Sequence, residues 1–249
     1  QPRSKPQAVE PSEIDVKKLK LSILNESSKK FDGNQYNING SNLISTLNEK
    51  LITNYSIKDN LILFESDGKK LKNKNFKYKG KINFNPFDLN LDIDLNKFKL
   101  NKLINSNSLL VELFKTKILL NENISAKIKV DINKNLNNKL FNSSKIILNV
   151  NNGKINFDRS MLFSNQIGSL KVADSVLFSD NNNLMLNCNL IVDVKNYNKF
   201  YSFFQTPRNS RKPIEKIYIN LDYNFFDDSM ILNSFKIDSR EPSLNNSEI

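Results

Sequence analysis

The chain has 249 residues, a formal net charge of +11 and a hydrophobic share of 39%, with no His, no Trp and one Cys. Without His there can be no Ser-His-Asp triad, no Cys-His pair and no His-ligated metal site, and one Cys excludes an internal disulfide. Six glycines leave little room for phosphate-cradling loops. This composition argues against most enzymes, so we expect no catalytic residues, no metal site and no cofactor.

The positive charge is scattered along the chain instead of forming one block. Lys77, Lys79 and Lys81 alternate with less polar residues, which predicts that these lysines share one face of a strand. Three interpretations stay open: a solvated face, weak attraction to anionic lipid headgroups, or nucleic-acid binding. We favour the solvated face and expect no nucleic-acid partner, because the aromatic residues of this segment would lie on the face opposite the lysines.

The two ends of the chain are polar. Residues 1–13 contain Pro2, Pro6 and Pro11 and have little to bury, which predicts a flexible arm or linker. Residues 239–249 predict a flexible tail, and residues 14–238 a single elongated β domain. No segment approaches the ~18–20 consecutive apolar residues that span a bilayer. We expect the chain to be a piece of a longer protein, with any membrane anchor outside it.

Strict alternation of apolar and polar residues is the main structural signal. It predicts strands with one dry and one wet face, as in antiparallel sheets, over residues 76–84, 87–95, 124–132, 146–150, 184–194 and 217–225. Shorter strand candidates cover residues 16–23, 61–64, 170–178 and 230–237. Asn151-Asn152-Gly153 predicts a hairpin with a type I′ turn.

Helical periodicity occurs in three places. It predicts short helices over residues 43–51, 103–118 and 197–204, the last with an aromatic face. None of the three is long enough to cover a sheet of eight or more strands. We therefore predict a mainly β fold, an elongated, curled, groove-like antiparallel sheet with a few short helices.

The apolar strand faces are the candidate binding site. In a closed sandwich they would fill one another, whereas in an open sheet they would line a trough that is costly in water. Acyl chains would fill such a trough favourably, by about 0.8 kcal/mol per buried CH₂. The candidate lipid-binding residues are Leu89, Leu91, Ile93, Leu95, Ile128, Val130, Leu186, Leu190 and Val192.

Other chemically suggestive residues have plainer interpretations. Asp92 and Asp94 share a strand face, which favours two solvated carboxylates over an acid–base pair. Cys188 lies on the apolar side of its strand and is expected to be a core residue. The basic residues Arg208, Arg211 and Lys212 follow the aromatic helix and could touch a phosphate headgroup. We favour instead a helix packed on the sheet by its aromatics, followed by a solvated loop.

The order of these segments resembles the C-terminal region of AsmA-like proteins, a group that includes the TamB-like envelope proteins. The resemblance covers roughly residues 76–238. It rests on the alternating strand 87–95, the segment 97–104 leading to a short helix through Phe114, the Gly-Lys-Ile-Asn-Phe sequence at 80–84 and 153–157, and the segment 198–208 continuing to Ile237. It implies bridge-like lipid transport, in which an inner-membrane anchor precedes a periplasmic β groove that carries phospholipid tails toward the outer membrane.

From the residues and this resemblance together we expect a non-enzymatic lipid-groove segment. It would be periplasmic and held at the inner membrane through a segment outside this chain. Its partners would be phospholipid acyl chains and other segments of a longer envelope protein or membrane partners. The alternative is a structural or adhesive β-sandwich or solenoid segment of an envelope or surface assembly, without a ligand. The two differ in whether the apolar side chains contact one another or line a cavity.

Overall fold

The computed structural model of the chain is mainly β, with 63% of residues in strands and 11% in helices. The structure describes residues 7–16, 21–32, 35–45, 50–67, 76–100, 102, 108–180 and 183–238. The chain divides into two compact units, Gln1–Asn96 (unit 1) and Lys97–Ile249 (unit 2), where the sequence predicted a single domain over residues 14–238. The predicted fold class, curled antiparallel sheet with a few short helices, is confirmed.

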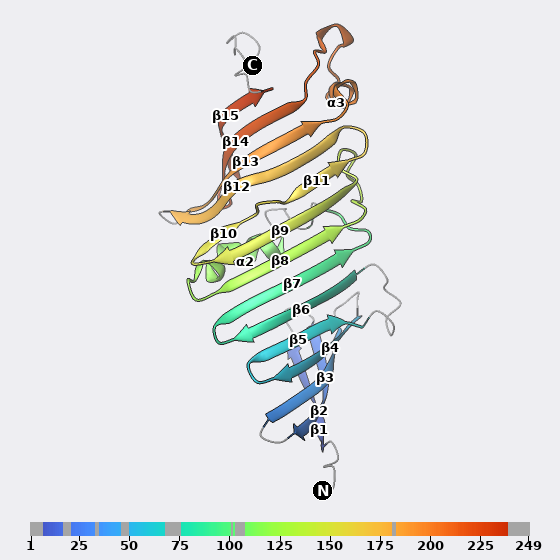
Figure 1. Ribbon diagram of the computed structural model, residues 1–249, viewed down its shortest axis with the longest axis vertical. Coiled ribbons are helices and arrows are strands. Elements are labelled where there is room, and N and C mark those ends of the chain that lie inside the picture. The colour runs from blue at the N-terminus through green and yellow to red at the C-terminus, as the bar shows by residue number, and fades with distance from the viewer. Residues whose placement is uncertain are drawn as a thin grey trace. The chain divides into compact units, whose positions relative to one another are not determined.

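Unit 1 is an antiparallel meander in which every strand pairs with the next one in the chain (Figure 1). Its strands are β1 (Gln7–Val16), β2 (Leu21–Asp32), β3 (Gln35–Ser45), β4 (Lys50–Lys58), β5 (Leu61–Ser66), β6 (Phe76–Phe84) and β7 (Phe87–Leu95). The strands β6 and β7 have the predicted bounds. The strictest alternation in the sequence therefore located the strand ends as well as the strands.

The first strand begins inside the segment that the sequence predicted to be a flexible arm. β1 starts at Gln7, and its register with β2 shifts between Val9 and Ser12. Pro11 lies within that shift, where a strand tolerates the missing backbone N–H of proline. Pro11 thus marks a register shift in the edge strand β1. Residues 1–6 and the predicted tail 239–249 lie outside the described part of the chain.

The helix predicted over residues 43–51 is wrong. Residues 43–45 end β3, residues 50 and 51 begin β4, and residues 46–49 lie outside the described part. Pairing explains the difference, because Leu43 lies opposite Leu24 and Ile44 opposite Ile23 in the neighbouring strand β2. Each apolar residue thereby gains an apolar cross-strand neighbour, which a short isolated helix could not provide.

Unit 2 is also antiparallel. Its strands are β8 (Ser125–Ile132), β9 (Ser143–Asn151), β10 (Lys154–Asn156), β11 (Met161–Ser164), β12 (Gly168–Asp180), β13 (Asn183–Val194), β14 (Lys216–Asn224) and β15 (Ser229–Ile237). The short strands β10 and β11 both pair with β9 and β12. Helix α2 (Leu109–Lys115), helix α3 (Tyr197–Phe203) and the 3₁₀ turns η2 (Ile118–Leu120) and η3 (Arg208–Ser210) complete the unit.

The two copies of Gly-Lys-Ile-Asn-Phe have different structures. Gly153 lies in the turn between β9 and β10, where Asn152 and Gly153 have φ of 49° and 68°, as the predicted type I′ turn requires. Gly80 instead lies in the middle of β6, opposite Leu91. The similarity of the two segments therefore reflects a shared strand pattern and no shared turn.

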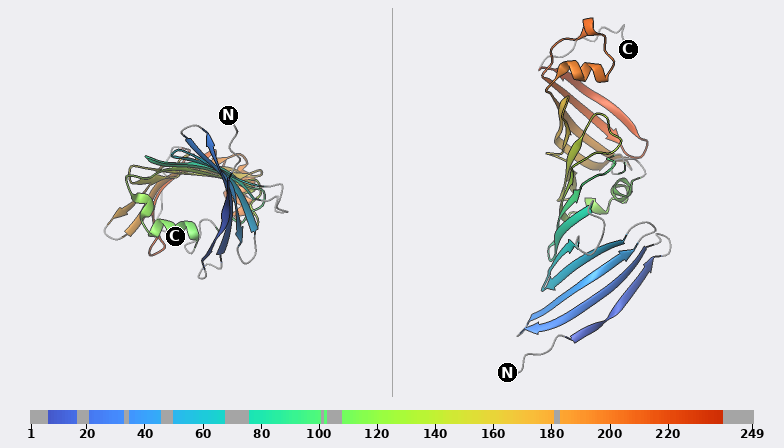
Figure 2. Two further views of the ribbon diagram at one scale, coloured as in Figure 1. Left: turned by 90° about the horizontal axis from the view of Figure 1, so that it is seen from below. Right: turned by 90° about the vertical axis from the view of Figure 1, so that its right-hand side faces the viewer.

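Unit 2 has a packed core beneath α2. Ser108 caps this helix by accepting a hydrogen bond from the backbone N–H of Val111 at 3.2 Å. Phe114 is 2% exposed and makes edge contacts with Phe157 and Phe225, at ring-centre distances of 5.8 and 6.1 Å. Figure 2 shows α2, in green, beside one face of the unit 2 sheet. The helix therefore packs on the apolar sheet face of its own unit through Phe114.

Candidate functional site

One face of unit 1 carries an aliphatic row that crosses five strands, β3 to β7. Cross-strand register aligns its members, each opposite the next: Ile38, Ile57, Ile62, Ile82 and Leu89. Because neighbouring strands lie about 4.8 Å apart, the row extends about 19 Å across the sheet. All five side chains are only half-buried. The row is therefore a continuous apolar track that is still open to solvent.

Two aromatic rings lie beside this row, each next to a glycine on the neighbouring strand. A Cβ added to Gly40 would meet the Tyr55 hydroxyl at 2.5 Å, and one added to Gly80 would meet the Phe64 ring and the backbone oxygen of Asn90 at 2.7 Å. The two glycines leave room for rings that a β-branched residue would push away from the sheet. Tyr55 and Phe64 thereby widen the apolar track.

A polar row on the same face modifies the prediction that the face is aliphatic throughout. The Asn25 amide donates to Asn42 Oδ1 at 2.6 Å and to the Tyr55 hydroxyl at 2.7 Å. Thr53, which is buried, and Tyr78 are hydrogen-bonded through their hydroxyl groups. These polar groups satisfy one another within the sheet. They therefore add little desolvation cost when an apolar ligand covers the face.

The predicted lipid-binding residues divide between the two units. In unit 1, Leu89, Leu91 and Ile93 are half-buried and share the face of the aliphatic row, while Leu95 is buried with 6% exposure. In unit 2, Val130 is buried at 9% exposure, and the other predicted residues, Ile128, Leu186, Leu190 and Val192, are half-buried. The structure thus places Leu95 and Val130 in packed positions, where they cannot line an open track.

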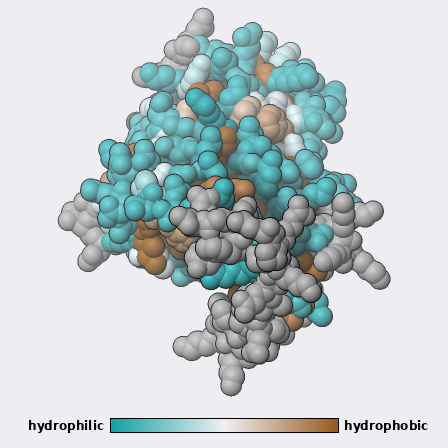
Figure 3. Space-filling model, turned by 60° about the horizontal axis from the view of Figure 1, so that its bottom comes forward, coloured by the Kyte–Doolittle hydropathy of each residue, from teal (hydrophilic) through white to brown (hydrophobic). Residues whose placement is uncertain are grey.

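The apolar faces of the two units differ in how far their side chains are buried. Leu95 is the only buried hydrophobic side chain among the described residues of unit 1. In unit 2, by contrast, Ile155, Leu177 and Leu184 have 0% exposure. The surface view in Figure 3 shows a mainly hydrophilic exterior with small separate hydrophobic patches. The same alternating pattern therefore gives a set of fully buried side chains in unit 2 and, among the described residues of unit 1, a face that stays half-buried.

An open hollow of about 460 Å³ lies among the middle strands of unit 1. Residues of β4, β5 and β6 line it: Asn54, Tyr55, Ser56, Leu63, Phe64, Glu65, Lys79 and Gly80. The lining mixes charged side chains with Leu63 and Phe64.

Within the described residues, no cluster of three or more His, Cys, Asp or Glu side chains could hold a metal ion. The same residues include no helix long and apolar enough to span a membrane.

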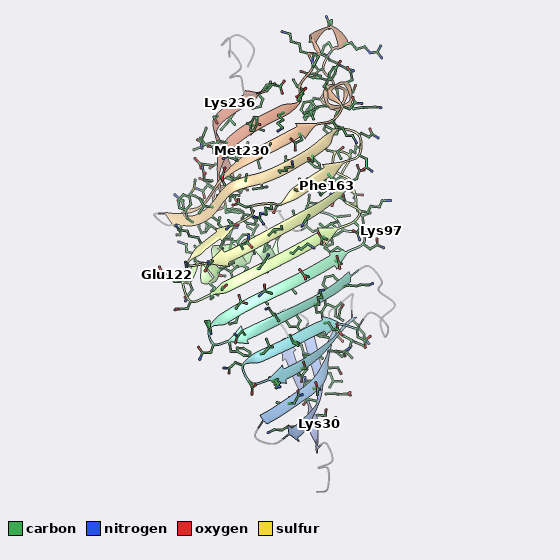
Figure 4. The ribbon with its side chains drawn as sticks, in the orientation of Figure 1. Lys30, Lys97, Glu122, Phe163, Met230 and Lys236 are labelled. Carbon is green, nitrogen blue, oxygen red and sulfur yellow. The ribbon has the colours of Figure 1, made fainter. Side chains whose placement is uncertain are left out.

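The edge strand β15 exposes consecutive hydrophobic residues. Met230, Ile231 and Leu232 are 65%, 59% and 57% exposed. Figure 4 places Met230 and Lys236 along this strand, which pairs with β14. Its hydrophobic residues lie outside the packed core of unit 2.

Cys188 is a free, buried residue, as the sequence predicted. Burial, followed by the negative charges of Asp222 and Asp158, raises the pKa of its thiol from 9.0 to about 11. Since only the thiolate reacts quickly, we expect the folded chain to resist a thiol reagent such as DTNB at about pH 8 and the urea-unfolded chain to react at once. Fast reaction of the folded chain would contradict the buried position.

The same pKa shift predicts a loss of stability at high pH. A folded-state pKa above that of the unfolded chain stabilises the fold fully below pH 9.0, and this contribution is lost as pH rises from 9.0 to about 11. Urea unfolding at a series of pH values measures the loss. The variant Cys188→Ala should show a smaller decline over this interval.

Several residues of the face were missed by the sequence analysis because it did not predict β3 and β4. Ile38 on β3 and Tyr55 and Ile57 on β4 belong to these strands. The alternation of Leu51, Thr53, Tyr55 and Ile57 was the signal that could have located β4.

Comparisons of the chain with protein-family models, with curated proteins and with solved structures gave no match, so the resemblance to AsmA-like proteins stays a prediction.

Proposed function

We propose that the chain is a non-enzymatic lipid-binding segment of an AsmA-like envelope protein, and that the open face of unit 1 binds phospholipid acyl chains in transit between the inner and outer membranes. The observation that carries this proposal is the half-exposed, register-aligned row Ile38, Ile57, Ile62, Ile82 and Leu89. In unit 2, the same strand pattern includes fully buried side chains, and a helix packs on the sheet through Phe114.

The expected affinity suits a lipid that must move. Burying about ten methylene groups gains about 8 kcal/mol at ~0.8 kcal/mol for each CH₂. Association costs of about 4–15 kcal/mol offset much or all of this gain. Binding should therefore be weak and exchangeable. Aliphatic side chains contact tails and not headgroups, so selectivity among phospholipid classes should be low.

The second candidate is a structural segment that holds no ligand, as expected for an envelope or surface assembly. The packed core of unit 2, with Ile155, Leu177 and Leu184 at 0% exposure, favours this function for that unit. Phe114 adds packing contacts with Phe157 and Phe225 to this unit. We therefore assign the proposed lipid binding to unit 1 and a supporting role to unit 2.

The test replaces part of the aliphatic row and measures bound lipid. We expect phospholipid to co-purify with the chain under gentle conditions, detected by native mass spectrometry and by lipid extraction. The double variant Ile57→Asn, Ile62→Asn should lose most of this lipid, because two polar amides interrupt the row that contacts the acyl chain.

The matched control is the double variant Leu61→Asn, Leu63→Asn. Both of these residues lie on β5, on the face opposite Ile62, and are 37% and 48% exposed. The control should keep its lipid, with circular dichroism verifying that both variants fold. A lipid-free parent chain, or equal losses in both variants, would contradict the proposal and favour the structural function.

A further inference from the structure

Helix α3 and the loop that follows it, residues 195–213 (the α3–η3 segment), project from unit 2 at the end of β13 (Figure 1). The predicted helix is present; Tyr197, Phe200 and Tyr201 are half-buried, and none of its side chains is fully buried. Phe203 and Phe204 are 41% and 56% exposed. Their main aromatic contacts are with each other and with Phe200, at ring-centre distances of 5.2 and 4.9 Å.

The projecting segment is held in place at both ends. At its start, the backbone N–H groups of Lys195 and Asn196 donate to the Ile167 carbonyl at 2.7 and 3.2 Å. Beyond its end, Ile214 is buried at 6% exposure. Between them, the Arg211 guanidinium donates to the Thr206 carbonyl at 2.9 and 3.0 Å and to Ser202 Oγ at 3.0 Å. The exposed rings are therefore presented by an ordered scaffold.

The segment is cationic and contains no carboxylate side chain. Lys195, Lys199, Arg208 and Lys212 are exposed, and none forms an ion pair with another residue in the described part of the chain. The nearest acidic residue before the segment, Asp193, pairs with Lys171 at 2.5 Å. Glu215, the first acidic residue after the segment, is exposed and forms none of these ion pairs. Exposed phenyl rings thus lie among positive charges that form no ion pair in the described part of the chain.

We propose that the α3–η3 segment docks unit 2 on the surface of an anionic phospholipid bilayer. Phe203 and Phe204 would enter the boundary between headgroups and acyl chains, while the surrounding cations would contact lipid phosphates. Charge complementarity carries this choice of partner. A bilayer fits better than single-stranded nucleic acid, because bases need free ring faces for stacking. Part of these ring faces already contacts neighbouring rings, and burial in hydrocarbon needs no free face.

The β14–β15 turn provides an internal comparison. Phe226 is 47% exposed, close to the exposure of Phe203 and Phe204, but Asp227 and Asp228 follow it directly. An anionic surface should repel this turn. Exposure of a phenyl ring alone therefore does not predict docking, whereas exposure among cations does.

The absence of Trp from the chain allows a site-specific fluorescence test. Phe204→Trp in the full chain should show a blue shift of its emission when vesicles of phosphatidylglycerol and phosphatidylcholine are added, and little shift with phosphatidylcholine alone. Phe226→Trp should show no shift with either vesicle. A shift for Trp at position 226 equal to that at position 204 would overturn the proposal.

Charge-reversal variants distinguish the effect of the cations in this segment on vesicle binding from the effect of the net charge of the chain. In the Phe204→Trp background, Lys199→Glu, Arg208→Glu and Lys212→Glu together should weaken vesicle binding at least about tenfold. Lys77→Glu, Lys79→Glu and Lys81→Glu on β6 change the net charge equally and should weaken it far less. Equal weakening, or a larger response to an oligodeoxythymidine than to vesicles, would overturn the proposal. Ile57→Asn, Ile62→Asn should leave docking unchanged, which keeps this test independent of the lipid-binding face.

Discussion

The substitution Phe114→Ala is expected to destabilise unit 2 by about 3–5 kcal/mol. Phe114 is 2% exposed and is the side chain of α2 that contacts both Phe157, just after β10, and Phe225, just after β14. Its truncation would leave a cavity between the helix and the sheet and would remove both edge-on aromatic contacts. Because α2 has only seven residues, it cannot persist without its tertiary contacts.

The measurement combines urea unfolding with hydrogen exchange. In the Phe114→Ala variant, peptides covering β10 with Phe157 and the end of β14 with Phe225 should exchange faster, because these positions lose their contact with the helix. Leu113→Ala is the matched control, since Leu113 lies on the same helix, is 38% exposed and should change stability by about 0.5 kcal/mol or less. Similar effects of the two substitutions would show that α2 does not pack on the sheet as described.

The strands of the structure were predictable where one face is wet and one is dry. In β7, leucine and isoleucine alternate with Asp and Asn, and the predicted and observed bounds agree. In β2 and β3, serine, asparagine or lysine residues occur at both odd and even positions, so the alternation of apolar and polar residues is weak in these strands. Those strands are specified by pairing along the meander, for example Asn25 with Asn42, which no local pattern reveals.

The helix predictions were limited in the same way, because local apolar spacing does not reveal strand pairing. The spacing of Tyr197, Phe200 and Tyr201 predicted α3 correctly, because the segment also starts with an N-cap, Asn196, which accepts a hydrogen bond from Lys199 N–H at 3.0 Å. The spacing of Leu43, Ile44 and Leu51 predicted a helix that does not form. The spacing of apolar residues alone could not distinguish the helix α3 from the strand residues at 43–45 and 50–51, because strand pairing determines the structure of the latter.

The candidate site could be predicted only in part. The sequence identified Leu89, Leu91 and Ile93 as members of an apolar face, and the structure places them there. It could not show that α2 packs on the sheet of unit 2, because the contact of Phe114 with Phe225 joins positions far apart in the chain. Nor could it show that Gly80 makes room for the Phe64 ring, since a mid-strand glycine has no local signature of its neighbour.

The substitution Gly168→Ala is also expected to cost about 3–5 kcal/mol, through the backbone instead of the core. Gly168 has φ of 147°, a conformation that costs residues with a Cβ about 1–3 kcal/mol. The added Cβ would also collide with the Asp193 carbonyl oxygen and lie 2.9 Å from the Lys195 N atom, where β12 pairs with the end of β13. Since both obstacles are backbone atoms, no rotamer change relieves them, and overpacking adds about 1–3 kcal/mol.

The position of Gly168 makes this prediction bear on the docking segment as well. Ile167, directly before it, accepts the hydrogen bonds from Lys195 and Asn196 that fix the start of α3. Gly168→Ala should therefore lower the urea midpoint, speed hydrogen exchange across residues 195–204 and weaken vesicle binding.

Gly153→Ala is the control, because Gly153 has φ of 68° and its Cβ would meet the Leu120 carbonyl oxygen at 2.9 Å, in a turn far from α3 along the chain. It should cost about 1–2 kcal/mol and leave α3 protected. A Gly168→Ala variant as stable as Gly153→Ala, with α3 still protected, would mean that the base of the docking segment does not depend on this close backbone approach.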